Sequence, residues 1–113
     1  MDCLFCKIIA GDIPSNKVYE DDFVLAFHDI NPQTPVHVLV IPKMHIPSVA
    51  AVNEENSDAV AKVFVAIAKV AKELGLEKDG YRVVSNCGEA AGQTVHHLHF
   101  HILGGRQLEL NMG

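Results

Sequence analysis

Histidines are concentrated in one short segment near the end of the chain. Four of the seven histidines fall between positions 96 and 101, and from His97 to His101 histidine alternates with apolar residues. In a β-strand, side chains two positions apart share a face and stand about 7 Å apart along it. The pattern therefore predicts that His97, His99 and His101 line one surface, while the apolar residues between them, and His96 before them, face the core.

A row of imidazoles of this kind favours three types of chemistry. The first is a three-histidine metal site, although equal spacing on one strand spreads the ligands and convergence usually needs a second element. The second is a general acid–base relay. The third is a nucleophilic histidine between two positioning histidines, because an imidazole has a reference pKa of about 6.5 and is largely neutral at pH 7. Such a nucleophile suits attack at phosphorus, since water can resolve a labile phospho-imidazole intermediate.

The loop before this segment supports phosphorus as the target. Gly92, Gln93 and Thr94 offer main-chain N–H groups and a hydroxyl to phosphate oxygens. The sequence has no G-x-x-x-x-G-K-[ST] element, and no acidic cluster lies close by to hold Mg²⁺. We therefore expect histidines and main-chain donors to stabilise the phosphate charge, with no cofactor required for catalysis.

The three cysteines indicate a metal half-site rather than disulfides. Their number is odd, and Cys3 and Cys6 have the two-residue gap that lets two thiolates converge on one metal ion. A thioredoxin-type redox motif is disfavoured because no strand precedes the pair, and two half-buried thiols near a terminus are the alternative. A metal site would need two more ligands, for which the histidines are the candidates.

Length and charge exclude several classes of protein. The chain has 113 residues, of which 49% are hydrophobic and 20% charged, and this predicts one globular domain over residues 1–113. Its net charge of −5 argues against binding to nucleic acid or to a membrane surface, because both need a basic patch. No apolar run approaches the ~20 residues of a membrane span, and residues 1–7 do not resemble a signal peptide. We expect a cytoplasmic protein.

The elements that must position these residues begin with a short helix and three strands. Residues 3–10 are predicted as a short helical turn that Ile13-Pro14 ends. Strands at 18–20 and 23–28 are expected to form a hairpin, and a third strand follows at 36–41 after a loop with two prolines.

One long helix and two further strands complete the predicted domain. Asn53 is expected to cap the helix and Gly75 to stop it. Its apolar residues recur every three or four positions and predict one buried face, formed by Val60, Val63, Phe64, Ile67, Val70, Ala71 and Leu74. Strands are expected at 81–85 and 95–103. The order β-β-β-α-β-β predicts an α+β fold, an antiparallel meander with the helix on one face.

The motif His97-x-His99-x-His101 resembles the signature of the histidine triad (HIT) superfamily. The resemblance, to its Hint branch, runs almost end to end through Phe5-Cys6-Lys7-Ile8-Ile9, Ala26-Phe27-His28-Asp29-Ile30, Gly92-Gln93-Thr94-Val95 and Leu103-Gly104-Gly105-Arg106. It implies the HIT fold, an antiparallel five-stranded sheet with one long helix and a short N-terminal helix. It also implies hydrolysis of purine nucleoside 5′-phosphoramidates to a nucleoside monophosphate and an amine through a nucleotidyl-histidine. The alternatives are dinucleoside polyphosphate hydrolysis, as in the sister branch, and a non-catalytic nucleotide-binding regulatory module.

The resemblance also implies roles for individual residues. His99 is the expected nucleophile, His101 and Asn86 hold phosphate or ribose oxygens, and His37 lies behind the triad and orients it. Asp29 binds the ribose hydroxyls, because a carboxylate accepts two hydrogen bonds from a vicinal diol. The other expected contacts are with the phosphate and leaving group, from Gly92, Gln93 and Thr94, and with the base, from Leu4, Phe5, Ile8, Phe27, His28 and Ile30.

Some of these roles have a purely structural alternative. Asp29 could simply cap the turn at Asn31-Pro32, and Asn86 could be a turn residue at the end of a strand. Phe27 and Ile8 are apolar enough to belong to the core alone. The sequence also departs from the family pattern. His96 replaces a usual tyrosine, and position 110 is leucine where many relatives carry a tryptophan, which leaves the preferred amine open.

A zinc site and a homodimer complete the expectations. Cys3, Cys6, His45 and His97 are predicted to bind one structural Zn²⁺, because Cys₂His₂ is a closed tetrahedral set and His45 follows a buried strand from which it reaches an N-terminal segment folded over the sheet. The resemblance agrees, since superfamily members with this cysteine pair carry zinc at these positions. A single long helix leaves sheet edges and apolar surface open, and the resemblance likewise implies a two-fold dimer.

Overall fold

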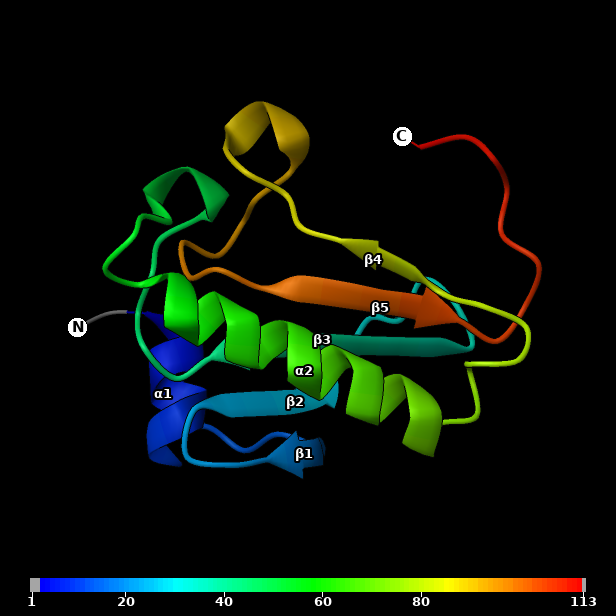
Figure 1. The fold of residues 1–113 in the computed structure, drawn as a ribbon, viewed down its shortest axis with the longest axis horizontal. Helices are drawn as coiled ribbons and strands as arrows, with labels where there is room; N and C mark the ends of the chain where they lie inside the picture. Colours follow the sequence, from blue (N-terminus) through cyan, green and yellow to red (C-terminus); the bar gives the residue numbers. More distant parts are fainter. Residues whose placement is uncertain (1–2, 113) are drawn as a thin grey trace.

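The structure, a computed structural model, describes residues 3–112, which form two α-helices and a five-stranded sheet (Figure 1). The helices are α1 (Leu4–Ala10) and α2 (Ser57–Glu73), and the strands are β1 (Lys17–Glu20), β2 (Val24–His28), β3 (Val36–Pro42), β4 (Arg82–Val84) and β5 (Phe100–Gly104). The predicted α+β class, with an antiparallel five-stranded sheet, one long helix and a short N-terminal helix, is confirmed.

Strand β5 lies inside the sheet rather than at its edge. The strand order is β1-β2-β3-β5-β4, and all neighbours are antiparallel. The predicted meander is therefore wrong for the last two strands. After α2 the chain runs through β4 at the edge of the sheet, and β5 then lies between β3 and β4. This order pairs Leu39 of β3 with His101 of β5, so His37 and His101 come from neighbouring strands.

The two helices cover opposite faces of the sheet (Figure 1). In β3, Val38 and Val40 belong to the core beneath α2, whereas Leu39 and Ile41 pack with Phe5 of α1. Strand β3 is buried on both faces, which explains its nearly continuous run of apolar residues. The face beneath α1 is the one that carries the candidate site.

The histidine segment is less regular than its sequence predicts. Its ladder with β3 begins only at Phe100, because the chain bends at residues 95–97 and the N–H of position 98 donates to the main-chain oxygen of Ile46 at 2.6 Å. The predicted alternation is nevertheless present. Positions 98, 100 and 102 pack in the core beneath α2, whereas the rings of His97 and His99 contact Phe5 on the other face.

His96 and several element boundaries differ from the predictions. His96 is exposed rather than directed to the core, because it lies within the bend. Helix α1 ends at Ala10, because the left-handed conformation of the next residue, Gly11 (φ 84°), stops the helix before Ile13-Pro14. The side chain of Asn53 accepts two N–H groups of a turn that precedes α2, and the helix itself begins at Ser57. Strand β4 is shorter than residues 81–85.

The apolar face predicted for α2 is only partly buried. The buried residues of α2 are Val63, Ala66, Ile67, Val70 and Ala71. Phe64, predicted as core, is 51% exposed and packs its ring against Phe100 at a centroid distance of 5.2 Å, and the next residue, Val65, is 56% exposed. Neither helix in the described part of the chain has the length and apolarity needed to cross a membrane.

Candidate active site and metal centre

A pocket of about 350 Å³ lies between α1, the loop at residues 13–16, the end of β2 and the histidine segment. Its largely apolar wall contains every residue predicted to contact the base: Leu4, Phe5, Ile8, Phe27, His28 and Ile30. Asp29, Thr94, His99 and His101 line the same pocket. The structure therefore brings most of the predicted substrate contacts to one pocket, in which apolar side chains and imidazoles lie together.

His99 is oriented by the main chain of its own segment. Its Nδ1 lies 2.7 Å from the main-chain oxygen of His97, and its ring meets the ring of Phe5 edge-on at 5.1 Å. A carbonyl oxygen only accepts hydrogen bonds, so Nδ1 of His99 carries the proton and Nε2 of the neutral ring has a bare lone pair. This is the atom that a nucleophilic histidine needs.

His101 lies beside His99, with 5.2 Å between the ring centroids, and its Nδ1 is 2.8 Å from Nε2 of His37. Burial, together with the neighbouring His99 and His37, lowers the pKa of His101 to about 4. Burial also lowers the pKa of His37, against the opposing effect of the Asp29 carboxylate. Both rings are consequently neutral at pH 7.

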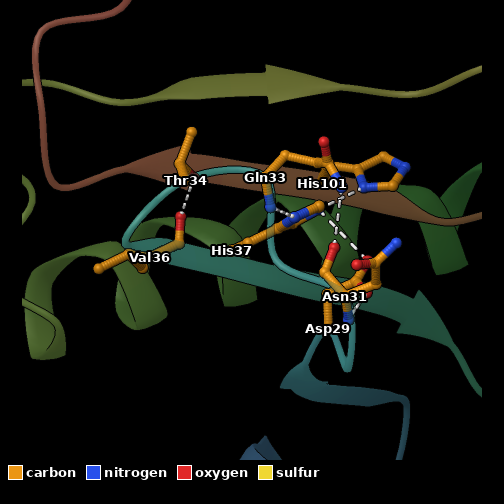
Figure 2. A network of polar contacts seen from close by, with 7 residues as sticks. All are labelled: Asp29, Asn31, Gln33, Thr34, Val36, His37 and His101. Atoms are coloured by element: carbon orange, nitrogen blue, oxygen red, sulfur yellow. Dashed lines mark hydrogen bonds and ion pairs between the residues drawn. The ribbon is translucent and has the colours of Figure 1, made fainter.

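Asp29 connects this pair to the loop that follows β2 (Figure 2). Its Oδ1 accepts the N–H of Asn31 at 2.8 Å, so the turn-capping alternative is present in the structure. Its Oδ2 lies 3.4 Å from Nε2 of His37, and the residue also lines the pocket. Capping the turn and facing the site are therefore compatible, because each uses a different oxygen.

A second cluster lies where α1 meets the bend of the histidine segment. The ligand atoms of Cys3, Cys6, His45 and His97 all lie within 4.8 Å of one another. Nδ1 of His97 lies 3.4 Å from the Cys3 sulfur and 3.6 Å from the Cys6 sulfur. Nδ1 of His45 lies 3.1 Å from Nδ1 of His97 and 3.3 Å from the Cys6 sulfur. Zinc bond lengths imply ligand separations of about 3.6 Å for S···N and about 3.3 Å for N···N in a tetrahedron.

The surroundings of His97 also fit a metal ligand. Its Nε2 lies 2.8 Å from the main-chain oxygen of Pro42, so Nε2 carries the proton and Nδ1 turns its lone pair to the cluster. Burial lowers the pKa of His97, which favours the neutral form that binds metals. The four predicted ligands thus lie close enough together to bind one zinc ion.

Of the loop residues predicted to contact phosphate, Thr94 lines the pocket, and the phosphate contact itself stays a prediction. The Gln93 side chain is buried and accepts the N–H of Gly88, while its amide donates to the main-chain oxygens of Pro47 and Val95. It therefore holds the loop together rather than facing the pocket. Gly92 and Asn86 also lie outside the set of pocket-lining residues.

Some site residues carried no signal in the sequence. The pocket wall includes residues 13–16, Leu39 and Val95, and their contribution depends on how the chain folds over the sheet. The Ser85 hydroxyl donates to the main-chain oxygen of His99 at 2.8 Å and so joins the end of β4 to the predicted nucleophile. Ser85 follows β4 directly, and the predicted strand at 81–85 was the one indication that it would lie near the sheet.

Comparisons with known proteins find chains that are similar in sequence and in fold. A model of the HIT domain matches residues 10–108. The purine nucleoside phosphoramidase of Escherichia coli (strain K12) is 47% identical over 105 residues, which are 93% of this chain and 88% of that protein. A histidine triad protein from Clostridium difficile superposes with a TM-score of 0.94 at 52% identity, covering 98% of this chain and 96% of the other. A HIT family hydrolase from Clostridium thermocellum gives a TM-score of 0.95 at 50% identity, with the same two coverages.

An α+β fold with a five-stranded sheet, in which His99 and His101 line a largely apolar pocket, defines the class of protein to which this chain is similar. The chain belongs to the HIT domain family. The resemblance predicted from the histidine motif is confirmed.

Proposed function

We propose that the protein is a nucleotide hydrolase that cleaves purine nucleoside 5′-phosphoramidates. Nε2 of His99 attacks the α-phosphorus, the phosphorus–nitrogen bond breaks, and the amine leaves with a proton taken from the solvent. Water then attacks the nucleotidyl-histidine, which releases the nucleoside monophosphate, returns a proton to the solvent and restores the imidazole. The similarity to the phosphoramidase of Escherichia coli supports this choice of substrate.

The observation that carries the proposal is the orientation of His99. The His97 oxygen holds a proton on Nδ1, so in the neutral tautomer the lone pair that a nucleophile needs is on Nε2. The apolar wall around Phe5 and Phe27 suits a purine ring, and Asp29 offers a carboxylate to the ribose hydroxyls. A pocket that served for binding alone would not need a bare imidazole nitrogen beside the phosphate.

One experiment distinguishes the proposed activity from its two alternatives, dinucleoside polyphosphate hydrolysis and nucleotide binding without catalysis. Adenosine 5′-phosphoramidate and a diadenosine polyphosphate should be offered side by side, and their kcat/KM values compared. We expect a higher value for the phosphoramidate. A higher value for the dinucleotide would indicate the sister activity, and binding of AMP without turnover of either substrate would indicate a regulatory module.

The Cys3–Cys6–His45–His97 cluster supports the second part of the proposal, one structural Zn²⁺ per chain. When bound there, zinc would hold the start of α1 against the histidine segment. Elemental analysis of protein purified without a metal-binding tag should find one zinc per chain, and none in the Cys3→Ser, Cys6→Ser variant. Sub-stoichiometric zinc in the unaltered protein would overturn this part.

A homodimer is the third part of the proposal. Among the described residues, β4 pairs only with β5 and leaves its other edge open, and Val83 on it is 37% exposed. An open edge with exposed apolar residues favours pairing with another chain. Sedimentation velocity at micromolar concentration should show a dimer, and a monomer would contradict this prediction.

A further inference from the structure

We propose that the main-chain N–H of Gln33 sets the tautomer of His37 and, through it, that of His101, so that neutral His101 presents a hydrogen-bond donor to the nucleotide phosphate. Gln33 is thereby a positioning residue that acts through its backbone. The inference rests on the proposed function, because it concerns how the same site binds phosphate.

The first step is the contact between Gln33 and His37. The Gln33 N–H lies 3.0 Å from Nδ1 of His37 and can only donate, so Nδ1 must accept. A neutral imidazole has one proton, and in His37 this proton is therefore on Nε2. His37 is only 6% exposed, so water has little access to reverse this arrangement.

The second step passes the same orientation to His101. Nε2–H of His37 donates to Nδ1 of His101 at 2.8 Å, which is shorter than the 3.4 Å to Oδ2 of Asp29. Nδ1 of His101 is thus an acceptor, and the proton of its neutral ring is on Nε2. Figure 2 shows the second ring nitrogen of His101 pointing away from His37, and His101 lines the nucleotide pocket.

The tautomer matters because His101 carries no charge at neutral pH. Its lowered pKa, about 4, means that a positive charge is not available to attract phosphate. A bare ring nitrogen would face the phosphate oxygens lone pair to lone pair, whereas an N–H donates to them. His99 holds the opposite tautomer, since its proton is on Nδ1. Main-chain groups therefore orient one ring as nucleophile and its neighbour as donor.

The loop around Gln33 is closed on both sides (Figure 2). Before it, Asp29 accepts the N–H of Asn31, and after it the Thr34 hydroxyl donates to the main-chain oxygen of Val36 at 2.5 Å. Thr34 is 9% exposed. These two bonds hold the Gln33 N–H in the direction of His37.

The same contact argues against a metal ion at Asp29, His37 and His101, although their ligand atoms also lie within 4.8 Å of one another. A ligating histidine donates its other ring N–H to an acceptor, as His97 does to Pro42. His37 faces an N–H donor instead, so its Nε2 keeps the proton that a metal would have to replace. The contacts among Gln33, His37 and His101 therefore fix which ring nitrogens carry protons.

The tautomers can be measured directly. In the full-length zinc-loaded protein with ¹⁵N-labelled histidine at pH 7, the ring nitrogen shifts should show Nε2–H for His37 and His101 and Nδ1–H for His99. An Nδ1–H tautomer at His37 or His101 would overturn the inference. This measurement needs no substrate, so a protein that fails to hydrolyse phosphoramidates but shows these shifts would contradict only the proposed function.

A variant pair tests the role of the amide. Gln33→Pro removes the N–H, whereas Gln33→Ala keeps it and removes only the side chain. Gln33→Pro should mix the His101 tautomers and lower kcat/KM about ten- to hundredfold, the usual loss for a hydrogen bond to a charged group. Gln33→Ala loses only the exposed bond from the Gln33 side-chain amide to the main-chain oxygen of Asn31, while the two bonds that close the loop remain, so it should retain the wild-type nitrogen shifts. Unchanged shifts in Gln33→Pro would overturn the inference.

Thr34 provides a second pair if Gln33→Pro does not fold. Thr34→Val removes the hydroxyl that closes the loop and should produce a mixture of His37 tautomers together with a lower kcat. Thr34→Ser keeps the hydroxyl and should restore a single tautomer. Loss of kcat in Thr34→Val with a single Nε2–H tautomer at both His37 and His101 would contradict the inference, because the loop would then act without reorienting protons.

Discussion

The main-chain oxygen of His97 lies 2.7 Å from Nδ1 of His99, while the ring of His97 belongs to the cysteine cluster. One residue therefore offers its side chain to the candidate metal centre and its backbone to the candidate nucleophile. Phe5, which lies between Cys3 and Cys6 in sequence, packs against both rings and lines the pocket. We therefore expect order at the candidate metal centre to be coupled to the pocket through α1 and His97.

Loss of the metal centre should weaken both stability and substrate binding. In the Cys3→Ser, Cys6→Ser variant we expect the free energy of unfolding to fall by about 3 kcal/mol or more, the linkage contribution of a ligand present well above its Kd. KM should rise more than kcat falls, because α1 forms a wall of the pocket. Urea unfolding and steady-state kinetics measure the two effects.

Cys87 supplies the matched control for that experiment. It is exposed and lies outside the cluster, so Cys87→Ser should change the free energy of unfolding by less than about 0.5 kcal/mol. Equal losses in the two variants would contradict a specific role for Cys3 and Cys6.

Stability should fall as the solution is acidified below neutrality. The pKa of His101 is 6.5 in the reference state and about 4 in the folded protein, and that of His37 is also lowered. The unfolded chain therefore binds protons that the folded protein excludes, so this stability is complete above pH 6.5 and is lost as the pH falls toward 4. Allowing for solvent screening, His101 should account for about 2 kcal/mol.

Urea unfolding at several pH values, with and without His101→Asn, tests this dependence. The variant should lose less stability between pH 7 and pH 5 than the unaltered protein does. A slope that is the same in both proteins would show that His101 does not titrate as its burial predicts.

Asp29→Asn should separate the two roles of the carboxylate. An asparagine oxygen still accepts the N–H of Asn31, so the turn and the melting temperature should be kept within a few degrees. The negative charge offered to the ribose is lost, and KM for a ribonucleoside phosphoramidate should rise about tenfold or more. For a 2′-deoxy substrate the same change should be much smaller, and an equal rise for both sugars would contradict ribose binding by Asp29.

The sequence predicted most strongly what depends on side-chain periodicity. Alternation placed His97 and His99 on the face opposite Leu98, and this is confirmed although the segment bends before its ladder begins. The long helix α2 was predicted from apolar residues that recur every three or four positions, and the structure contains it. The grouping of Cys3 and Cys6 with two distant histidines was also predicted, and the structure contains it, while zinc itself stays a prediction.

What the sequence could not show depends on main-chain atoms and on neighbours distant in the chain. Gln93 lies in a loop whose residue types suit phosphate binding. Its side-chain amide nevertheless donates a hydrogen bond to the main-chain oxygen of Pro47, which is distant in the sequence. His96 is exposed because of a bend that no alternation pattern reveals. The Gln33 N–H and the His97 oxygen are present in almost any residue, so their roles appear only when the backbone is placed.

The most direct test of the proposed mechanism is to trap the covalent intermediate. Protein mixed with adenosine 5′-phosphoramidate and quenched with base within milliseconds should yield one adenylylated peptide, with the nucleotidyl group on His99. The His99→Ala variant should show no adduct and a kcat lower by several orders of magnitude, while it still binds AMP. An adduct on another residue, or turnover by His99→Ala near the unaltered rate, would contradict nucleophilic catalysis by His99.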